Sequence, residues 1–305
     1  MTIDALAGLA AAATSPAAGL AAGTGPLDPR LPVAERVRRD LLSYDAQRMA
    51  TPDGIRLGQE LLSVVGGVTT PYATDVDGEQ GPDTTARLRS FQAAQRLPDT
   101  GRFDEATFRR LVQPILAACE LPAPSKGARA DVVAVANRFA AHGAREISPN
   151  AGPWVRLFMA GNEGRSWAWC AGFATFVWVL AAAAAADAAA ALERVRRYRS
   201  FDCDVIATRA QADGRFVEGS EVAAGRASIL PGDLFLVQAR ERDWVHVGVV
   251  TAVRDGGRRI ATVEGNTNAG GSREGLYVLA RERAVTGGRA SGLDFVRLPS
   301  AGAAQ

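Results

Sequence analysis

An apolar stretch from Ala168 to Leu192 constrains the fold of this chain more than any other segment. Its residues are small, apolar or aromatic, and it passes without a proline into an alanine-rich tract, which predicts one long helix. Cys170 falls in the first turn of that helix. Unpaired amide N–H groups and the positive end of the helix dipole gather there and lower the pKa of a thiol. The stretch predicts a reactive cysteine at the start of an apolar helix; the alternative is a small buried hydrophobic residue.

The composition is typical of a globular protein with two domains, since the chain has 305 residues, 47% of them hydrophobic and 22% charged. The net charge of +2 gives no basic surface of the kind that binds nucleic acid. The three cysteines, Cys119, Cys170 and Cys203, match neither a zinc site nor a disulfide framework, so at least one thiol is expected to be free. No metal or organic cofactor is expected.

Residues 1–25 are rich in alanine and glycine, and they predict a flexible leader. Asp4 stands where a secretory signal would carry a basic residue, which argues against an ordinary signal peptide. No membrane span is expected, because the tract Ala181 to Ala191 is only weakly hydrophobic and contains Asp187. An amphipathic helix is predicted from Pro32 to Met49.

Residues 26–120 are predicted to form a helical module together with that preceding helix. One helix carries Leu57, Leu61 and Leu62, the next begins at Pro82, and a third is capped by Asp104. Such a three-helix unit of about sixty residues is near the lower size limit for independent folding. The acidic loop from Asp75 resembles a calcium loop only loosely, since Gln80 occupies the position where an EF-hand requires glycine.

The order of turn residues in this module is specific, although each residue alone only makes a turn. The pattern is Asp77-Gly78-x-x-Gly81-Pro82-x-Thr84, then Phe91-Gln92, then Leu97-Pro98-x-Thr100-Gly101-x-x-Asp104-x-x-Thr107. This pattern resembles the small bacterial peptidoglycan-binding module. The resemblance implies docking on the glycan or the stem peptide of peptidoglycan.

A second domain is predicted over residues 130–300, after a linker at 121–129 and before a tail at 301–305. Helices are expected from Ala130 to His142 and from Trp154 to Ala160, followed by the cysteine helix and a polar stretch that contains Cys203. Strands follow at Asp233 to Val237, Val245 to Val253, Arg259 to Glu264, Gly275 to Ala280 and Leu293 to Leu298. Helices first and strands afterwards predict an α+β domain whose antiparallel sheet packs on the cysteine helix.

The chain has two histidines, so few residues can serve as a general base. His142 ends a helix, where an imidazole is typically a surface cap, whereas His246 begins a hydrophobic strand. A structural role for His246 is the alternative, but beside Cys170 it is the expected base. Glu264 and Asn266 close the next strand, and either could accept the other N–H of the imidazole.

Strand pairing offers a test of this arrangement, because side chains alternate between the faces of a sheet. A three-residue turn at Asp255-Gly256-Gly257 pairs Arg254 with Arg258 and places His246 opposite Asn266, on the same face as Glu264. A two-residue Gly256-Gly257 turn would place them on opposite faces.

Several segments in order resemble the CHAP domains and the related NlpC/P60, papain-like amidases, which are cysteine enzymes of bacterial cell-wall turnover. They are Glu146, Asn150-Ala151-Gly152, Trp169-Cys170-Ala171-x-Phe173, Pro231-Gly232-Asp233-Leu234, His246-Val247-Gly248-Val249-Val250 and Glu264-Gly265-Asn266. The resemblance covers roughly Ala130 to Leu298. Arg165-Ser166 with Ala168 and the long alanine tract depart from the family pattern and leave the shape of the groove open.

The resemblance implies cleavage of peptidoglycan amide bonds through a thioester. Cys170 would attack, His246 would move the proton, and Glu264 or Asn266 would orient the imidazole, with Trp169 and Trp244 as the predicted substrate contacts. Two alternatives are a wall-binding or structural protein with a decayed cysteine domain, and a cysteine acyltransferase.

The expected partner is peptidoglycan, at the cell wall or in the periplasm. The route of the chain to the wall stays open between phage lysis, as for an endolysin, secretion as an effector that is matched by an immunity protein, and a contractile particle. The scissile bond also stays open between an amidase and an endopeptidase cleavage.

Overall fold

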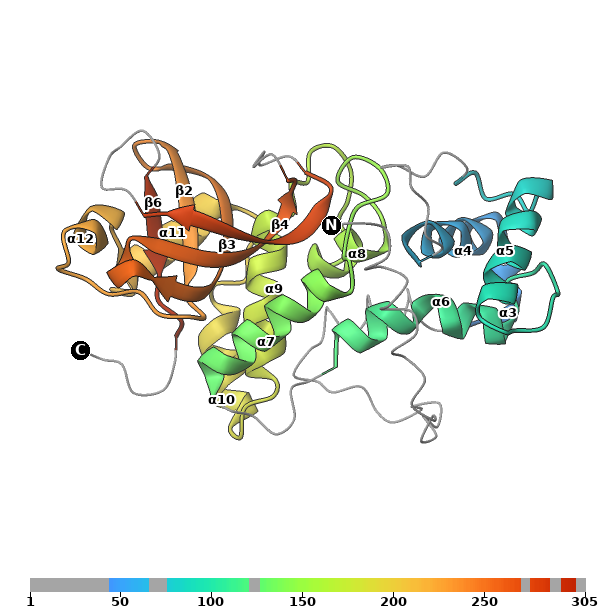
Figure 1. Cartoon of the computed structure of the whole chain (residues 1–305), viewed down its shortest axis with the longest axis horizontal. Helices are drawn as coiled ribbons and strands as arrows, with labels where there is room; N and C mark the ends of the chain where they lie inside the picture. Colours follow the sequence, from blue (N-terminus) through green and yellow to red (C-terminus); the bar gives the residue numbers. More distant parts are fainter. Residues whose placement is uncertain (1–43, 66–75, 121–126, 270–274, 286–291, 300–305) are drawn as a thin grey trace.

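The computed structural model describes residues 44–65, 76–120, 127–269, 275–285 and 292–299 (Figure 1). Helices α3 to α6 lie at one end of the molecule and the sheet at the other, with α7, α8 and α9 between them. The predicted leader at 1–25, the tail at 301–305 and most of the linker at 121–129 lie outside the described residues.

The helical end contains α3 (Ala46–Met49), α4 (Pro52–Val65), α5 (Pro82–Ala94) and α6 (Glu105–Ala118). Two predicted helix starts are confirmed: Pro82 opens α5, and the carboxylate of Asp104 caps α6 by accepting from the Thr107 amide at 2.9 Å. The predicted helix from Pro32 to Met49 is wrong where it is described, because Asp45 is extended and its side chain caps a new helix at Ala46.

The remaining helices are α7 (Ala128–Ala141), α8 (Pro153–Phe158), α9 (Cys170–Ala182), α10 (Ala188–Arg196), α11 (Cys203–Ala212) and α12 (Gly219–Ala223). The prediction of one helix from Ala168 to Leu192 is wrong, since α9 ends at Ala182 and α10 begins six residues later. Asp187 explains the new start, because its carboxylate accepts from the Ala190 amide at 3.2 Å. The polar stretch that contains Cys203 is also helical and is capped by Asp202.

The strands form one antiparallel sheet, as predicted, in the order β1-β6-β2-β3-β4-β5. They are β1 (Phe216–Val217), β2 (Leu234–Arg240), β3 (Asp243–Arg254), β4 (Arg259–Thr267), β5 (Tyr277–Ala284) and β6 (Leu293–Val296). Val247, Val249 and Val263 belong to the same hydrophobic cluster as α9, and Phe235 and Phe295 belong to a second, smaller cluster.

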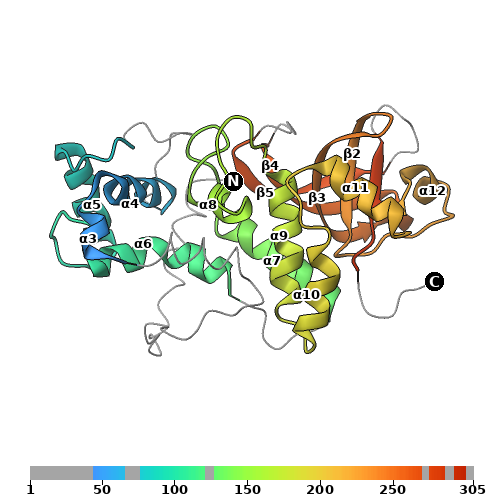
Figure 2. The same cartoon turned by 180° about the vertical axis from the view of Figure 1, so that it is seen from behind.

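Helix α9 is the centre of the molecule, and every one of its residues is buried. In the view from behind, it lies between the sheet on one side and helices α4, α6 and α8 on the other (Figure 2). An aromatic cluster surrounds its first turns: Phe173 packs edge-on against Phe158 at 5.2 Å and against Phe139 at 6.0 Å between ring centroids. A helix that is apolar on all sides must be covered on all sides, which is why α9 organises the core.

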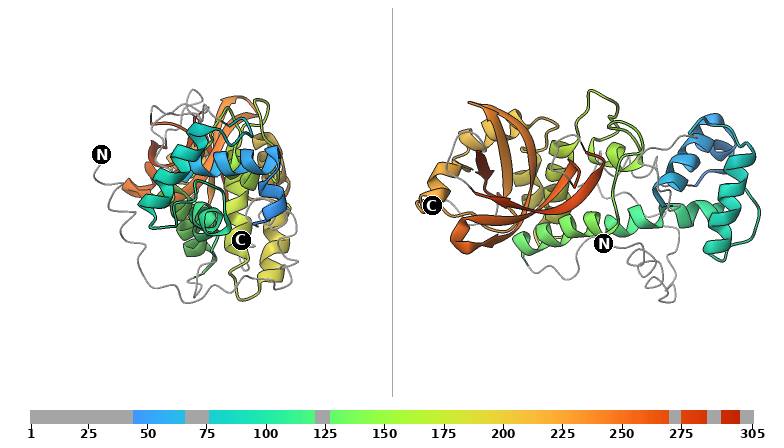
Figure 3. Two further views of the ribbon diagram at one scale, coloured as in Figure 1. Left: turned by 90° about the vertical axis from the view of Figure 1, so that its right-hand side faces the viewer. Right: turned by 45° about the horizontal axis from the view of Figure 1, so that its top comes forward.

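The two ends of the molecule share this core. Buried residues of α4 and α6 belong to the same hydrophobic cluster as those of α7 and α9. Helices α6 and α7 follow one another lengthwise in the tilted view of Figure 3. Arg156 of α8 also reaches back to Glu60 of α4, with Nη1 donating to Oε1 at 3.2 Å. The helical module therefore packs against the part of the chain that contains α7, α8 and α9.

Candidate active site

Cys170 is the first residue of α9, and the residue before it is held firmly. The indole Nε1 of Trp169 donates to Glu146 Oε2 at 2.9 Å, and the indole ring stacks on Phe158. Glu146 Oε2 also accepts from the amide of Asn150 at 3.1 Å. One buried carboxylate thus holds both the start of the cysteine helix and the loop upstream of it.

His246 on β3 meets Glu264 on β4 across the hairpin. The imidazole Nε2 lies 2.9 Å from Glu264 Oε2, and both side chains are buried. Arg283 of β5 donates to both oxygens of Glu264 at 2.6 Å, and the Thr262 hydroxyl donates to Oε1 at 2.7 Å. Of the two candidate orienting residues, Glu264 is the one that bonds to the imidazole.

The turn between β3 and β4 differs from the predicted one. Arg254 pairs with Arg259, and not with Arg258, so four residues lie in the turn. The sum of the paired numbers is therefore odd at this end of the hairpin. A regular ladder from this turn would have placed His246 and Glu264 on opposite faces of the sheet.

A bulge corrects the register before the site. Thr251 has no partner on β4, so that Val250 pairs with Thr262 and the sum becomes even. His246 and Glu264 consequently share a face, as predicted, but for a different reason. Gly248, which lies between them, has no side chain to block the contact: a Cβ there would stand 3.0 Å from Glu264 Cγ.

Asn266 does not bond to the imidazole. Its backbone is left-handed, with φ of 56°, its side chain is buried, and its Nδ2 has no hydrogen-bond partner among the described residues. A buried side-chain amide without a partner and a strained backbone are features that cluster at functional sites.

The charges of the site are set by its neighbours. The side chain of Cys203 lowers the pKa of Cys170 well below its usual value, and His246 and the Val247 amide lower it further, while burial opposes them. Burial alone would lower the pKa of His246, but Cys170 and Glu264 raise it to about 9. Burial opposes the charge of Glu264, yet Arg283 and His246 lower its pKa to about 2. These shifts favour a thiolate–imidazolium pair with a permanently charged carboxylate behind it.

The imidazole leaves one nitrogen for the thiol. His246 Nδ1 has no hydrogen-bond partner in the described part of the chain, because Nε2 is taken by Glu264. Cys170 lies close enough to shift the pKa of His246, although the thiol is not aligned as a hydrogen bond to Nδ1. Catalytic contacts of this kind are often loose in the free protein and tighten when substrate binds.

The predicted substrate contacts Trp169 and Trp244 lie in the core instead, exposed by 0% and 6%. Each indole N–H already has an acceptor, Glu146 for Trp169 and Asp294 for Trp244. The exposed aromatic residue beside the cysteine is Trp167, at 38% exposure. Trp167 stands three residues before Cys170. Its ring packs edge-on against Phe201, with 6.1 Å between the ring centroids.

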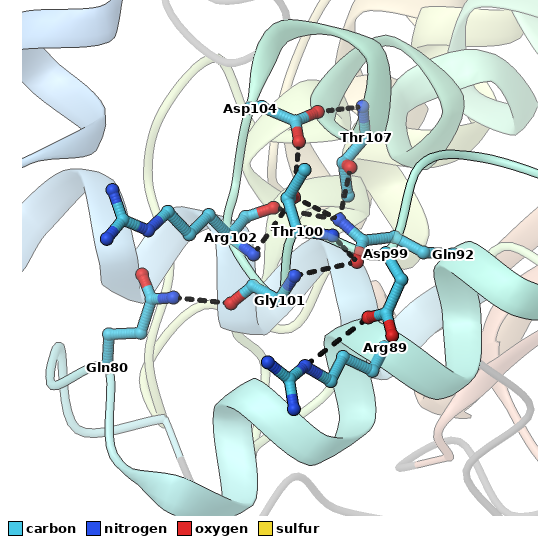
Figure 4. A network of polar contacts seen from close by, with 9 residues as sticks. All are labelled: Gln80, Arg89, Gln92, Asp99, Thr100, Gly101, Arg102, Asp104 and Thr107. Atoms are coloured by element: carbon cyan, nitrogen blue, oxygen red, sulfur yellow. Dashed lines mark hydrogen bonds and ion pairs between the residues drawn. The ribbon is translucent and has the colours of Figure 1, made fainter.

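The motif residues of the helical module are used by its own fold (Figure 4). The buried Gln92 accepts from the amides of Thr100 and Gly101, and its Nε2 donates to the Thr107 hydroxyl at 2.8 Å. It thereby fixes the whole loop between α5 and α6.

A second glutamine repeats this arrangement one loop earlier. Gln59 Nε2 donates to Asp77 Oδ1 at 2.8 Å and to the Thr84 hydroxyl at 3.1 Å, and its Oε1 accepts from the Gly78 amide. The residues that carry the resemblance therefore shape the loops of the module.

Within the described residues, no group of three or more histidine, cysteine, aspartate or glutamate side chains is placed to hold a metal ion. None of the helices described is both long and apolar enough to cross a membrane.

Comparison with known proteins bears on the helical end of the chain. Residues 51–111 match the family model described as "Putative peptidoglycan binding domain". No curated protein and no solved structure matches the chain. The matched range holds α4, α5 and the first half of α6, the helices whose loops Gln59 and Gln92 organise. The match supports the predicted peptidoglycan-binding module and associates the chain with the cell wall.

Proposed function

We propose that the chain is a peptidoglycan hydrolase that cuts an amide bond with Cys170 as nucleophile. The observation that carries this proposal is the grouping of Cys170, His246 and Glu264. His246 bonds to Glu264, the pKa of the Cys170 thiol is lowered, and the pKa of the His246 imidazole is raised to about 9. Titratable groups whose pKa values are pushed in opposite directions mark acid and base partners.

The chemistry follows from these charges. The Cys170 thiolate attacks the carbonyl carbon, and the oxyanion forms near the amides at the start of α9. The His246 imidazolium gives its proton to the leaving amine, which departs and leaves a thioester. Neutral His246 then takes a proton from water, the hydroxide attacks the thioester, and the thiolate is restored. Glu264 orients the ring and stabilises its charge through Nε2.

The helical module contributes by keeping the enzyme on its substrate. Peptidoglycan is a polymer, so a bound module raises the local concentration of scissile bonds around Cys170. The match of residues 51–111 supports this role. The bond that is cut lies either between the sugar and the stem peptide or within the peptide. Mass spectrometry of the released fragments would distinguish the two.

Clearing of a suspension of purified cell walls tests the proposal. The wild-type protein should lower the turbidity, and Cys170→Ala should abolish the effect while it still pellets with the walls. Cys119→Ala is a matched control, because Cys119 is also buried but ends α6 in the module. Full clearing by Cys170→Ala would rule out the thiol mechanism, and clearing by neither protein would favour a wall-binding protein without this activity.

A further inference from the structure

Arg283 has no step in the hydrolysis described above, yet its side chain ends on the carboxylate that bonds to the imidazole. Arg283 lies on β5 and pairs through its backbone with Ile260 of β4, so its side chain extends along β4 to reach Glu264. Its Nε donates to Oε1 and its Nη2 donates to Oε2, each at 2.6 Å. Two parallel bonds of this kind fix both the position and the plane of a carboxylate.

The hydrogen bonds on Glu264 leave its carboxylate one orientation. Oε2 lies 2.9 Å from His246 Nε2 and also accepts from Arg283. Oε1 accepts from the Thr262 hydroxyl at 2.7 Å and again from Arg283. Arg283 bonds to both oxygens, whereas His246 and Thr262 bond to one each, so the guanidinium determines which way the carboxylate faces.

The guanidinium is itself held by an aromatic ring. Its Cζ lies 4.9 Å from the centroid of the Phe235 ring on β2, and the centroid of the His246 ring lies 6.2 Å from the same point. Gly248 permits this arrangement, because a Cβ at that position would stand 2.6 Å from Phe235 Cε1. Arg283 is therefore placed by a cation–π contact as well as by its ion pair.

Burial makes the cation necessary. The side chains of Glu264 and His246 are exposed by 0% and 2%, and that of Arg283 by 22%. A thiolate, an imidazolium and a carboxylate would together leave one negative charge without a partner, and an unpaired buried charge is costly. The charged groups that act on Glu264 are Arg283 of β5 and His246 of β3. On the same side, β2 presents the ring of Phe235 and β4 the hydroxyl of Thr262.

We propose that Arg283 is a positioning residue of the active site, which acts through Glu264: it holds the carboxylate against Nε2 of His246 and thereby leaves Nδ1 to exchange a proton with the thiol. This inference rests on the proposed function. A carboxylate that already accepts from a guanidinium and a hydroxyl is a weak base, so the proton stays on Nε2. Arg283 takes part in no covalent step.

The rate of Cys170 alkylation by iodoacetamide, measured against pH with a reductant present, tests the inference without peptidoglycan. In Arg283→Met, the Glu264 carboxylate loses its cation and takes up a proton more readily, so it supports less well the imidazolium that keeps the thiol ionised. We expect the acid midpoint of the profile to rise by about one pH unit. Arg283→Lys keeps the charge and should recover most of that shift. Arg259→Met is the matched control, because Arg259 forms an exposed pair with Glu282.

A double variant separates action through Glu264 from a general effect on the fold. Glu264→Gln removes the carboxylate on which Arg283 acts, so adding Arg283→Met to it should raise the midpoint no further. The double variant lacks both members of the ion pair and leaves no buried carboxylate without a partner. It therefore gives a result even if Arg283→Met alone fails to fold, as thermal unfolding would show.

Several outcomes would overturn the inference. They are a midpoint of Arg283→Met equal to that of the wild type, a lower plateau rate without a shift, an Arg283→Lys profile equal to that of Arg283→Met, and a further rise in the double variant. Mass spectrometry identifies the alkylated cysteine. A wild-type protein in which Cys170 has the midpoint of an ordinary thiol and clears no cell walls would instead count against the proposed function itself.

Discussion

At the scale of single residues, the charge of the His246 imidazole governs the chemistry proposed for the site. Burial alone would lower the pKa of the imidazole, but Cys170 and Glu264 raise the pKa to about 9. A raised pKa means that the imidazolium persists through neutral pH and is lost as the pH rises through about 9. The acid needed to protonate the leaving amine disappears with it.

The first prediction concerns the loss of activity at alkaline pH. The kcat/KM for wall fragments should fall above about pH 9, and Glu264→Gln should move that fall to lower pH, because the anion that stabilises the imidazolium is gone. Thr262→Val is the matched control, since it removes one hydrogen bond to Glu264 but keeps the charge. A pH profile of Glu264→Gln that coincides with the wild-type profile would contradict the orienting role.

Trp167 is the second residue with a testable consequence. It is exposed, stands three residues before Cys170, and is held on Phe201, which makes it a rigid aromatic surface beside the nucleophile. Trp167→Ala should raise the KM for wall fragments roughly tenfold with little change in kcat, as expected for the loss of one aromatic contact. Trp167→Phe should retain most of the binding. An unchanged KM in Trp167→Ala would exclude this contact.

At the scale of elements, the distance between α9 and β4 sets the geometry of the site. Gly265 makes their close approach possible, since a Cβ at this position would lie 2.8 Å from both Phe173 Cβ and Trp169 Cζ3. Residues 264 and 266 on either side belong to the candidate site. The glycine between them is therefore a packing requirement of the cysteine helix.

Gly265→Ala should push α9 away from β4. We expect a loss of about 1–3 kcal/mol in the free energy of unfolding, typical of overpacking, and a fall in kcat because Cys170 moves relative to His246. Gly256→Ala is a useful comparison, because nothing lies within 4 Å of a Cβ at that turn, although its φ of 66° adds strain. Denaturant unfolding and wall clearing measure the two effects, and a Gly265→Ala protein with wild-type activity would show that the spacing is not critical.

The hairpin of β3 and β4 shows which features of a strand pair can be predicted from the sequence. The shared face of His246 and Glu264 was predicted from alternation, but through a three-residue turn. The structure has a longer turn and a compensating bulge at Thr251. A bulge depends on how the strand packs in the whole sheet, and the residues near Thr251 carry no local signal for it.

At the scale of the whole molecule, the helical module and the cysteine domain are joined by a polar contact as well as by a common core. Arg156 donates to Glu60 of the module and to Glu163 of its own domain. Arg145 Nη2 also donates to the carbonyl of Ser63 at 2.6 Å. The module is thereby held in one orientation relative to α8.

Glu60→Gln should loosen this docking. We expect a loss of about 1–3 kcal/mol in the free energy of unfolding, because a partly buried ion pair is broken although Arg156 keeps Glu163. Digestion of insoluble walls should fall more than cleavage of a soluble muropeptide, which does not need the module. Glu105→Gln is the control, since its pair with Arg109 is exposed and should contribute less than about 1 kcal/mol. Equal loss with both substrates would place the module within the catalytic fold.

Local chemistry alone determined several features of this protein. The starts of α5 and α6, the antiparallel sheet after the helices, and the cysteine at the start of an apolar helix follow from residues that are neighbours in sequence or from a short repeat pattern. Such features depend on caps, prolines and alternation, which act over one or two turns of chain.

Tertiary structure decided the rest, because it depends on contacts between distant residues. It buried Trp169 and Trp244, and it introduced the bulge at Thr251 that brings His246 and Glu264 to one face of the sheet. No local pattern shows that Trp169 will be buried while Trp167, two residues earlier, will be exposed. Those outcomes are fixed only when the helices and strands pack, since packing alone determines burial, the local dielectric and the charges that each side chain faces.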